Sequence, residues 1–337
     1  MATTRRRTVA AAAAVALATV LGGMAPAGAA PGRITEYELS PGFNVPRDIT
    51  TGRDGAMWFT ELVGDRIGRI TRSGALTEYP LPPGHRGPFA INPGPGPALW
   101  FTEIDANRIG RISYTGQITE FVLPNPGSGP LGIVQGPDGN MWFTENHGNR
   151  IGRITPSGAI TEWPIPTPDS LPGDIIVGPD GNLWFTETET SKIGRITPNG
   201  VITEWATPTP NARPEGITAG PDGAVWFTEH DAGKVGRITT TGAIREFPLL
   251  GPGRQPVDIV VGWDCALWFA QAGQNTGVGR ITTGGAVTEF PVGNPGAHVS
   301  GITVAVDGNI WFTESFANRI GRLETDPHNR PCAGRSF

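Results

Sequence analysis

Trp-Phe dipeptides recur along this 337-residue chain at an almost constant interval, and this repeat restricts the fold more than any other feature. The seven dipeptides begin at Trp58, Trp100, Trp142, Trp184, Trp226, Trp268 and Trp311, so five steps are 42 residues and the last is 43. A period of this length is typical of four-stranded blades arranged around an axis, and seven blades can close into a ring. Features that all seven units share are therefore structural, whereas features that one unit has alone are candidates for function.

Each unit contains four short segments with the composition of β-strands, as the third unit shows. We expect its strands over residues 131–135, 141–145, 150–155 and 159–164, with tight turns at Pro-Asp-Gly (137–139) and Pro-Ser-Gly (156–158). Trp142 and Phe143 are neighbours on a strand, so their side chains point to opposite faces of the sheet, and both faces are expected to be buried. The chain is therefore predicted to be all-β, a seven-bladed β-propeller of four-stranded antiparallel blades.

The last unit lacks a fourth strand, and a matching segment, Arg-Ile-Thr-Glu-Tyr, stands at 33–37. We predict that this N-terminal strand pairs into the seventh blade and closes the ring. The short turns after the first and third strands lie on one face of the disc. The variable loops lie on the other face, where binding groups usually sit. Cys265 and Cys332 both fall on the face with the short turns, and we predict a disulfide between them.

Residues 1–30 lie outside the repeat and have the pattern of an export signal peptide. Arginines at 5–7 precede an Ala-rich apolar run and a small-residue cleavage site. Sec and twin-arginine export both stay open, and a retained membrane anchor is the alternative, although the run is short for a span. We therefore predict a signal peptide over 1–30, a propeller over 31–325, a C-terminal tail over 326–337 and a secreted protein.

Loss of the signal would remove three arginines and no acids, and so would change the formal charge from -5 to -8. A chain with this charge is not suited to neutralising phosphates, which excludes nucleic acid as an expected partner. We expect a monomer without a stable membrane span. Its ligand is expected to be a small molecule or a peptide, bound at the face with the variable loops.

The repeat motifs WFTE, IGRIT and ITE, as in 138–166 (DGNMWFTENHGNRIGRITPSGAITEWPIP) and 211–229 (NARPEGITAGPDGAVWFTE), resemble the blades of the virginiamycin B lyase (streptogramin B lyase) family. The resemblance covers the whole chain after the signal. It implies a seven-bladed propeller that opens a cyclic depsipeptide antibiotic by elimination at its ester, with Mg²⁺ assisting, and so confers antibiotic resistance.

The chain departs from this family where the family does its chemistry. Val257 and Ser300 stand at the positions of the two catalytic histidines, His298 at that of a glutamate and Arg47 at that of a tyrosine. Valine cannot move a proton, and serine is a poor base without an activating partner. The family mechanism therefore cannot run unchanged on this chain.

Comparison of the seven units singles out blade five. It alone places a carboxylate, Glu215, and an imidazole, His230, at adjacent strand ends on the variable face, with Arg213 beside them. We take Glu215, His230 and His298 as candidate catalytic residues. The alternative for the blade-five group is a solvated, salt-bridged loop pair. Arg47, Arg213, Arg254 and Ser300 are candidate substrate-binding residues, and the metal ligands stay unknown.

Two repeated sets of charged residues are predicted to be structural. The glutamate that ends the WFTE motif occurs in six units and is expected to accept hydrogen bonds within its own loop, with Gln271 in the remaining unit. The arginine of the third strand occurs in all seven and is expected to form ion pairs between blades.

Two functions of different classes therefore stay open. The first is a lyase-like enzyme that opens a cyclic depsipeptide or a related ester. The second is a non-catalytic propeller that binds a ligand or a protein. A metal-dependent lactonase is a distant third, because the sequence does not supply the channel carboxylate cluster that it would need.

Overall fold

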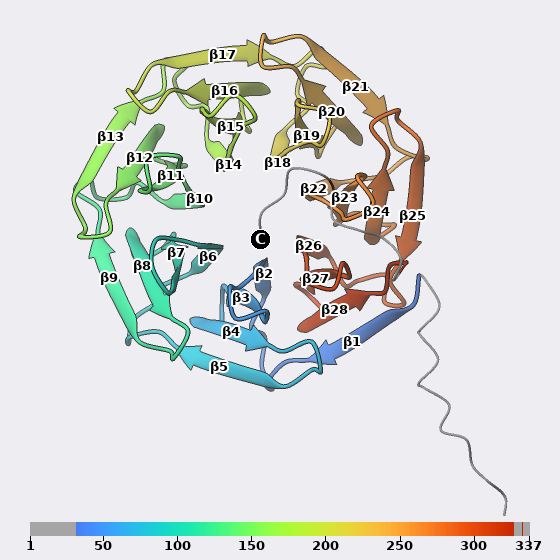
Figure 1. Ribbon diagram of the computed structural model, residues 1–337, viewed down its shortest axis with the longest axis horizontal. Helices are drawn as coiled ribbons and strands as arrows, with labels where there is room; N and C mark the ends of the chain where they lie inside the picture. Colours follow the sequence, from blue (N-terminus) through green and yellow to red (C-terminus); the bar gives the residue numbers. More distant parts are fainter. Residues whose placement is uncertain (1–31, 327–331, 333–337) are drawn as a thin grey trace, which may run out of the picture.

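The computed structural model describes residues 32–326 and Cys332, so the predicted signal peptide lies outside the described residues. The described chain forms 28 strands in seven four-stranded antiparallel sheets, arranged as a ring (Figure 1). The predicted all-β, seven-bladed propeller is confirmed. No helix in the described part of the chain is long and apolar enough to cross a membrane.

The first three complete blades are β2(Pro46–Thr51), β3(Met57–Glu61), β4(Arg66–Ile70) and β5(Leu76–Pro80); β6(Pro88–Pro93), β7(Ala98–Glu103), β8(Arg108–Ser113) and β9(Ile118–Val122); and β10(Pro130–Gln135), β11(Met141–Glu145), β12(Arg150–Ile154) and β13(Ile160–Pro164). The next three are β14(Pro172–Val177), β15(Leu183–Glu187), β16(Lys192–Ile196) and β17(Ile202–Ala206); β18(Pro214–Ala219), β19(Val225–Glu229), β20(Lys234–Ile238) and β21(Ile244–Pro248); and β22(Pro256–Val261), β23(Leu267–Gln271), β24(Gly277–Ile281) and β25(Val287–Pro291).

The seventh blade combines β26(Val299–Val304), β27(Ile310–Glu314) and β28(Arg319–Leu323) with the N-terminal strand β1(Ile34–Glu38). Strand β1 pairs antiparallel with β28 and forms the outermost strand of this blade, at the rim of the disc (Figure 1). Tyr37 of β1 stacks on Trp311 of β27, with ring centroids 5.4 Å apart. The predicted closing strand is thus present, and it supplies the aromatic contact that the fourth strand supplies in other blades.

The core lies between the blades and is built from the repeated aromatic residues. Trp142 and Phe143 are fully buried although they point to opposite faces of their sheet, as expected for a blade packed between two others. Trp142 stacks on Trp163 of the same blade at 5.0 Å. Its indole Nε1 donates to Asp138 in the turn between the first two strands, which ties the turn to the core.

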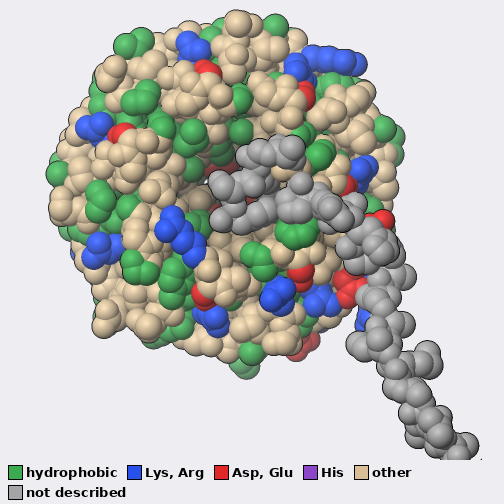
Figure 2. Space-filling view, viewed as in Figure 1, with side chains coloured by type: hydrophobic (Ala, Val, Ile, Leu, Met, Phe, Trp, Pro, Cys, Tyr) green, Lys and Arg blue, Asp and Glu red, His purple; other side chains and the backbone are tan. Residues whose placement is uncertain are grey.

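Six of the seven repeated arginines of the third strands form an ion pair with a carboxylate of their own blade, so the prediction of ion pairs between blades was wrong. Arg153 contacts the carboxylate of Asp138 at 3.5 Å and lies over the ring of Trp142 at 5.6 Å. The contact that does reach the next blade is to a backbone carbonyl, as in Arg111 to Pro156. Figure 2 shows several basic side chains around the disc with acidic ones beside them. The pairing of the second and third strands places the arginine beside a turn of its own blade. This register explains why the ion pairs form within a blade and not between blades.

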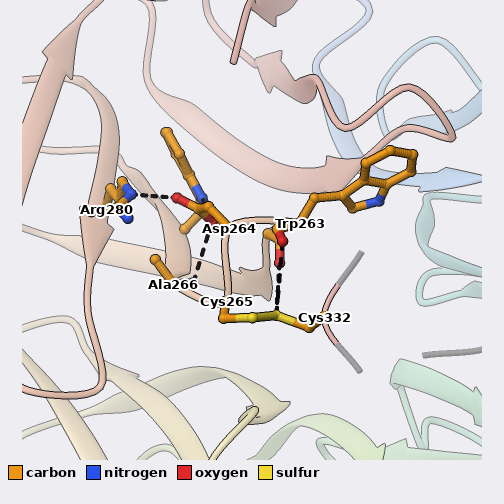
Figure 3. Close-up of a disulfide and its surroundings, with 8 residues drawn as sticks. Trp263, Asp264, Cys265, Ala266, Arg280 and Cys332 are labelled. Atoms are coloured by element: carbon orange, nitrogen blue, oxygen red, sulfur yellow. Dashed lines mark hydrogen bonds and ion pairs between the residues drawn. A yellow bond between two sulfur atoms is a disulfide. The ribbon is translucent and has the colours of Figure 1, made fainter. Parts of the chain in front are cut away.

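Cys265 and Cys332 form a disulfide, with their Cα atoms 5.5 Å apart (Figure 3). Cys265 lies in the turn after β22 with a φ of 59°, and Asp264 beside it pairs with Arg280 at 2.5 Å. Cys332 of the tail is thereby tied to blade six on the face with the short turns.

We expect the protein, unfolded in denaturant without reductant, to show no mass increase with a thiol-alkylating reagent, because both sulfur atoms are in the disulfide. Two adducts should form once a reductant is added. Intact-protein mass spectrometry measures both states, and alkylation without reductant would contradict the disulfide.

Candidate functional site

A β-bulge in every first strand builds the mouth of the central channel. In blade one, Pro46 pairs with Glu61 and Ile49 with Phe59, so Arg47 and Asp48 together oppose Thr60. A bulge re-aims side chains next to it, and here it leaves two residues per blade at the mouth. Thr60 fixes the bulge, since its hydroxyl accepts from Asp48 N at 3.1 Å and donates to Phe89 O of the next blade at 2.7 Å.

The bulged residues and the loops after the second strands line a cavity of about 500 Å³ on the variable face. Blades two to four contribute apolar side chains, among them Phe89, Leu131 and Leu171. Polar side chains line the same cavity, among them Glu215 and Ser300, and Asp174 of blade four is also one of them. The lining therefore combines apolar and polar groups, which suits a ligand that has both.

Three aspartates of the bulges, Asp48, Asp174 and Asp258, face the channel and are half-buried. Asp48 accepts from Ile49 N and from Ile91 N of the next blade, each at 2.7 Å. Burial raises the pKa of Asp48 to about 7 and that of Asp258 to about 6, and it raises the pKa of Asp174 well above its usual range. These carboxylates join neighbouring blades. Each aspartate directly follows the first bulged residue of its strand, which is the position that the sequence comparison used. A comparison of the following position across the seven units would have found the aspartates.

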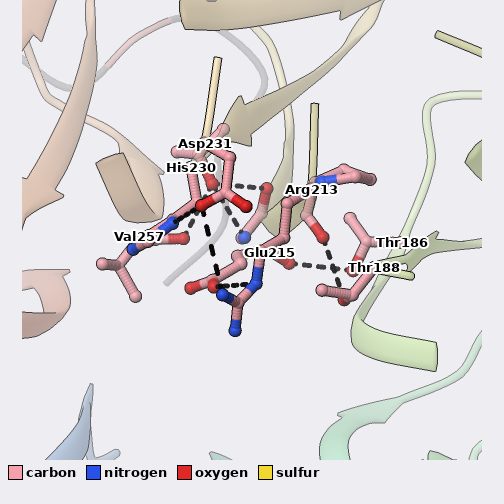
Figure 4. Close-up of polar contacts among 10 residues, drawn as sticks. Thr186, Thr188, Arg213, Glu215, His230, Asp231 and Val257 are labelled. Carbon is pink, nitrogen blue, oxygen red and sulfur yellow. Dashed lines mark hydrogen bonds and ion pairs between the residues drawn. The ribbon is translucent and has the colours of Figure 1, made fainter. Parts of the chain in front are cut away.

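The blade-five candidates form a connected group in which each side chain has its own partner (Figure 4). Arg213 lies 3.3 Å from the carboxylate of Glu215 and 4.0 Å from that of Asp231. His230 Nδ1 lies 2.6 Å from Asp231 Oδ1. The structure therefore pairs Glu215 with Arg213 and His230 with Asp231, and not Glu215 with His230. Asp231 follows His230 directly in the sequence, but its role as the partner of the imidazole depends on the loop conformation.

His298 of blade seven begins a chain of hydrogen bonds that runs into the wall of the cavity. Its Nδ1 lies 3.1 Å from Ser300 Oγ, which lies 2.6 Å from Ser315 Oγ. Ser315 donates to Pro46 O at 2.6 Å. Because the single proton of Ser315 is used there, Ser300 donates to Ser315 and accepts from His298 Nδ1–H. Nε2 is then the basic nitrogen of the neutral ring.

Burial lowers the pKa of His298, and the positive charge of Arg47 lowers it further. The imidazole is therefore neutral near neutral pH, which is the state that a general base requires. Ser300 lines the cavity, whereas His298 is half-buried, is not one of the lining residues, and packs against Phe316 with ring centroids 4.5 Å apart. The sequence comparison did not single out Ser315. Blade seven is nevertheless the only blade with a serine both at this position, directly after the second-strand glutamate, and at the position of Ser300.

The remaining candidates lie apart from one another. Arg47 lines the cavity with its guanidinium 4.8 Å from the ring centroid of Phe89. Arg254 pairs with Glu289 and borders a neighbouring groove of about 430 Å³, which His230 also borders. The cavity therefore brings together Glu215, Arg213, Arg47 and Ser300. His298 contacts the cavity-lining Ser300, and His230 and Arg254 border the next groove.

No three His, Cys, Asp or Glu side chains within 32–326 lie close enough together to hold a metal ion. Mg²⁺ is often held by one or two protein carboxylates together with substrate oxygens. The side chains of the described residues do not form a metal cage on their own.

Comparisons with known proteins agree on one family. The model of the virginiamycin B lyase family matches residues 8–215 and 168–330. A solved streptogramin B lyase is 39% identical, covers 87% of this chain and 98% of its own, and superposes with a TM-score of 0.84. Virginiamycin B lyase from Staphylococcus aureus is 42% identical, with 87% and 99% covered and a TM-score of 0.83, and a catalytically inactive form with quinupristin matches equally.

A more distant match shows the fold alone: hydrazine synthase from Kuenenia stuttgartiensis is 16% identical, with 85% of this chain and 97% of its own covered and a TM-score of 0.69. No curated protein matched the chain in sequence.

Proposed function

We propose, because the chain belongs to the virginiamycin B lyase family, that its mouth cavity binds a cyclic depsipeptide or a related ester and opens the ring by elimination. His298 acts as the general base in this proposal. The observation that carries it is the chain of hydrogen bonds from His298 through Ser300 and Ser315 to the Pro46 carbonyl, which leaves Nε2 as the basic atom of a neutral imidazole that contacts the cavity-lining Ser300.

The elimination needs one base and no water. His298 Nε2 takes the proton from the carbon beside a carbonyl, and the electrons of that bond form a carbon-carbon double bond. The bond from the neighbouring carbon to the ester oxygen breaks, and the oxygen leaves as part of a carboxylate. Arg47, which is a cation in the cavity wall, stabilises the negative charge that develops there.

The mixed polar and apolar lining of the cavity suits such a substrate. A cyclic depsipeptide presents apolar side chains on one side of the ring and amide and ester oxygens around it. Phe89, Leu131 and Leu171 would contact the apolar groups, while Arg47 and Ser300 face the oxygens.

The test is incubation of the protein without its signal peptide with a streptogramin B depsipeptide, with Mg²⁺ or with a chelator, followed by mass spectrometry. Elimination should give a linear product of unchanged mass, since the product is an isomer of the substrate. A gain of one water molecule would show hydrolysis and contradict the proposal. The chelator arm tests the Mg²⁺ dependence that we propose from the family resemblance.

A non-catalytic binding protein is the second candidate, favoured by Val257 and Ser300 at the family's histidine positions and by the internal pairing of the blade-five group. A rise in the melting temperature with the depsipeptide, without turnover, would identify it. Because the N-terminal segment has the pattern of an export signal, we also propose that the protein acts outside the cytoplasm in antibiotic resistance. The N-terminal sequence of the protein recovered from culture medium tests the predicted cleavage.

A further inference from the structure

The glutamate that ends each second strand is fully buried in six blades, and its environment is unusual. We expected hydrogen bonds within its own loop, but in five of the six both carboxyl oxygens lack a donor among the described residues, and only Glu187 has one, from Thr190. The prediction holds for Glu187 and was wrong for the other five, where a second carboxyl group stands beside the first. The pairs are Glu61 with Glu78, Glu103 with Glu120, Glu145 with Glu162, Glu187 with Glu204, Glu229 with Glu246, and Glu314 with Glu36.

Blade five shows how the charge is distributed in one pair. Lys234 at the start of the third strand contacts Glu246 at 2.6 Å, and Thr209 donates to the same carboxylate. Burial opposes ionisation of Glu246, but these contacts outweigh it and lower its pKa. Glu229 is hydrogen-bonded to Glu246, and burial and the charge of Glu246 raise its pKa to about 8. One cation thus compensates one carboxylate, and the other carboxyl keeps its proton.

Blade six provides an independent indication of the same state. Gln271 replaces the buried glutamate there, and its Nε2 lies 3.5 Å from the carboxylate of Glu289. Glu289 keeps one cation, Arg254, although the third strand begins with Gly277. Glutamine has the shape of a protonated glutamic acid and cannot ionise. Blade six therefore has a permanently neutral side chain at the position where the buried glutamate of each other blade needs a proton to be neutral.

We propose that six of the seven blades each contain a buried proton-binding site, formed by the second-strand glutamate as donor and the fourth-strand glutamate as acceptor, which makes folding of the propeller dependent on pH. A buried and a half-buried carboxylate beside a single cation, as in blade five, would leave an uncompensated charge, which is costly in a protein interior. Binding of one proton per pair removes that charge and converts a repulsive contact into a hydrogen bond. Blade two differs in its cations, since Arg86 and Arg108 both contact Glu120.

The direction of the pH effect follows from the linkage between protonation and folding. Glutamates with a raised pKa in the folded state bind protons that the unfolded chain has released. Their contribution to stability is therefore complete below the usual glutamate pKa, and it is lost as pH rises through about 7 to 8. We expect this contribution to the free energy of unfolding to fall as pH rises from the usual glutamate pKa to about 8.

Blade three gives the sharpest test because it lies away from the candidate catalytic histidines. Glu145 faces Glu162, Arg150 and Ser128, and Asn125 donates to Glu162. In Glu145→Gln the amide should donate to Glu162 without a titrating proton. The variant should unfold like the parent protein at acidic pH and should be more stable than the parent above neutral pH.

The number of protons linked to folding, taken from the slope of unfolding free energy against pH, should be smaller by about one in Glu145→Gln. Gln271→Glu is the reverse variant and should increase that number by about one. The channel aspartates also titrate, but they are common to all variants and cancel in the differences. Glu246→Gln of blade five is the control, since it removes the ionised partner of Lys234 and should destabilise the protein at every pH.

These experiments measure unfolding and use no substrate, so they are independent of the proposed lyase activity. Equal slopes in the parent and both variants would overturn the proposal. A Glu145→Gln variant that is less stable than the parent at all pH values would also overturn it, because it would show that the glutamate is ionised in the folded protein.

Discussion

Replacement of Gly152 by alanine is expected to lower the free energy of unfolding by about 3 kcal/mol. Gly152 of β12 pairs across the strand with Phe143, whose ring lies directly over it. A Cβ atom at this position would stand 2.2 Å from the ring, closer than two carbon atoms can approach without a shift of the chain or the ring. The ring is fully buried between two blades and has no free space to move into.

A second substitution shows whether this clash is the cause. Phe143→Leu is itself destabilising, but it removes the ring that meets the new methyl group. The double variant should therefore be more stable than the sum of the single effects predicts, by at least 1 kcal/mol or so in a double-mutant cycle. Gly293→Ala is the control, since a Cβ there meets nothing within 4 Å. Additive effects of Gly152→Ala and Phe143→Leu would contradict the clash as the cause.

The repeat predicted the fold closely because it reports directly on local structure. The strands of blade three were expected within one residue of their observed ends, and the closing strand at 33–37 was identified from its composition. The tight contact of Gly152 with Phe143 was not predicted, although the glycine recurs in every unit. Sequence shows that a glycine is repeated, but the distance to the ring that requires it depends on the packing of two strands.

The predictions that failed concern partners of charged side chains. Arg153 was expected to reach the next blade, but it pairs with Asp138 of its own. Glu145 was expected to bond to its loop, but it meets Glu162. In each case the residue type and its repetition were correctly read as structural. The partner of each charged side chain could not be predicted, because several charged groups recur with the same period. Only the register of the strands shows which of these groups are in contact.

The site was predicted only in part for a related reason. Arg47, Glu215 and Ser300 line the cavity because they occupy the first bulged position of their strands, which the comparison of units had located. Asp48 and its equivalents were missed because a strand without a bulge would turn successive side chains to opposite faces. The bulge brings both successive side chains to the mouth of the channel, and the sequence of a single unit does not predict the bulge.

The largest effect on activity is expected for His298→Ala, which should lower kcat by roughly 10²-fold to 10⁴-fold on a streptogramin B depsipeptide, the usual contribution of a general base. The free energy of unfolding should change little, since the side chain is only half-buried. Ser315→Ala should have a smaller effect, because it removes the acceptor that orients Ser300 and through it the Nδ1–H of His298. His85→Ala is the control, since this exposed imidazole lies outside the cavity and pairs with Asp65 and Asp105.

The pH profile distinguishes a base from a side chain that only supports the loop. His298 acts when neutral, so kcat/KM should rise with pH through its lowered pKa and be complete by neutral pH. Burial is the first cause of that lowering and the charge of Arg47 the second. Arg47→Gln removes the charge, so the pKa of His298 should increase and the acidic limb of the profile should move to higher pH. An acidic limb that stays in place in Arg47→Gln, or a rate that His298→Ala leaves unchanged, would show that another group is the base. His230 is the first alternative, because Asp231 contacts its Nδ1 and leaves Nε2 as the basic nitrogen, as Ser300 does for His298.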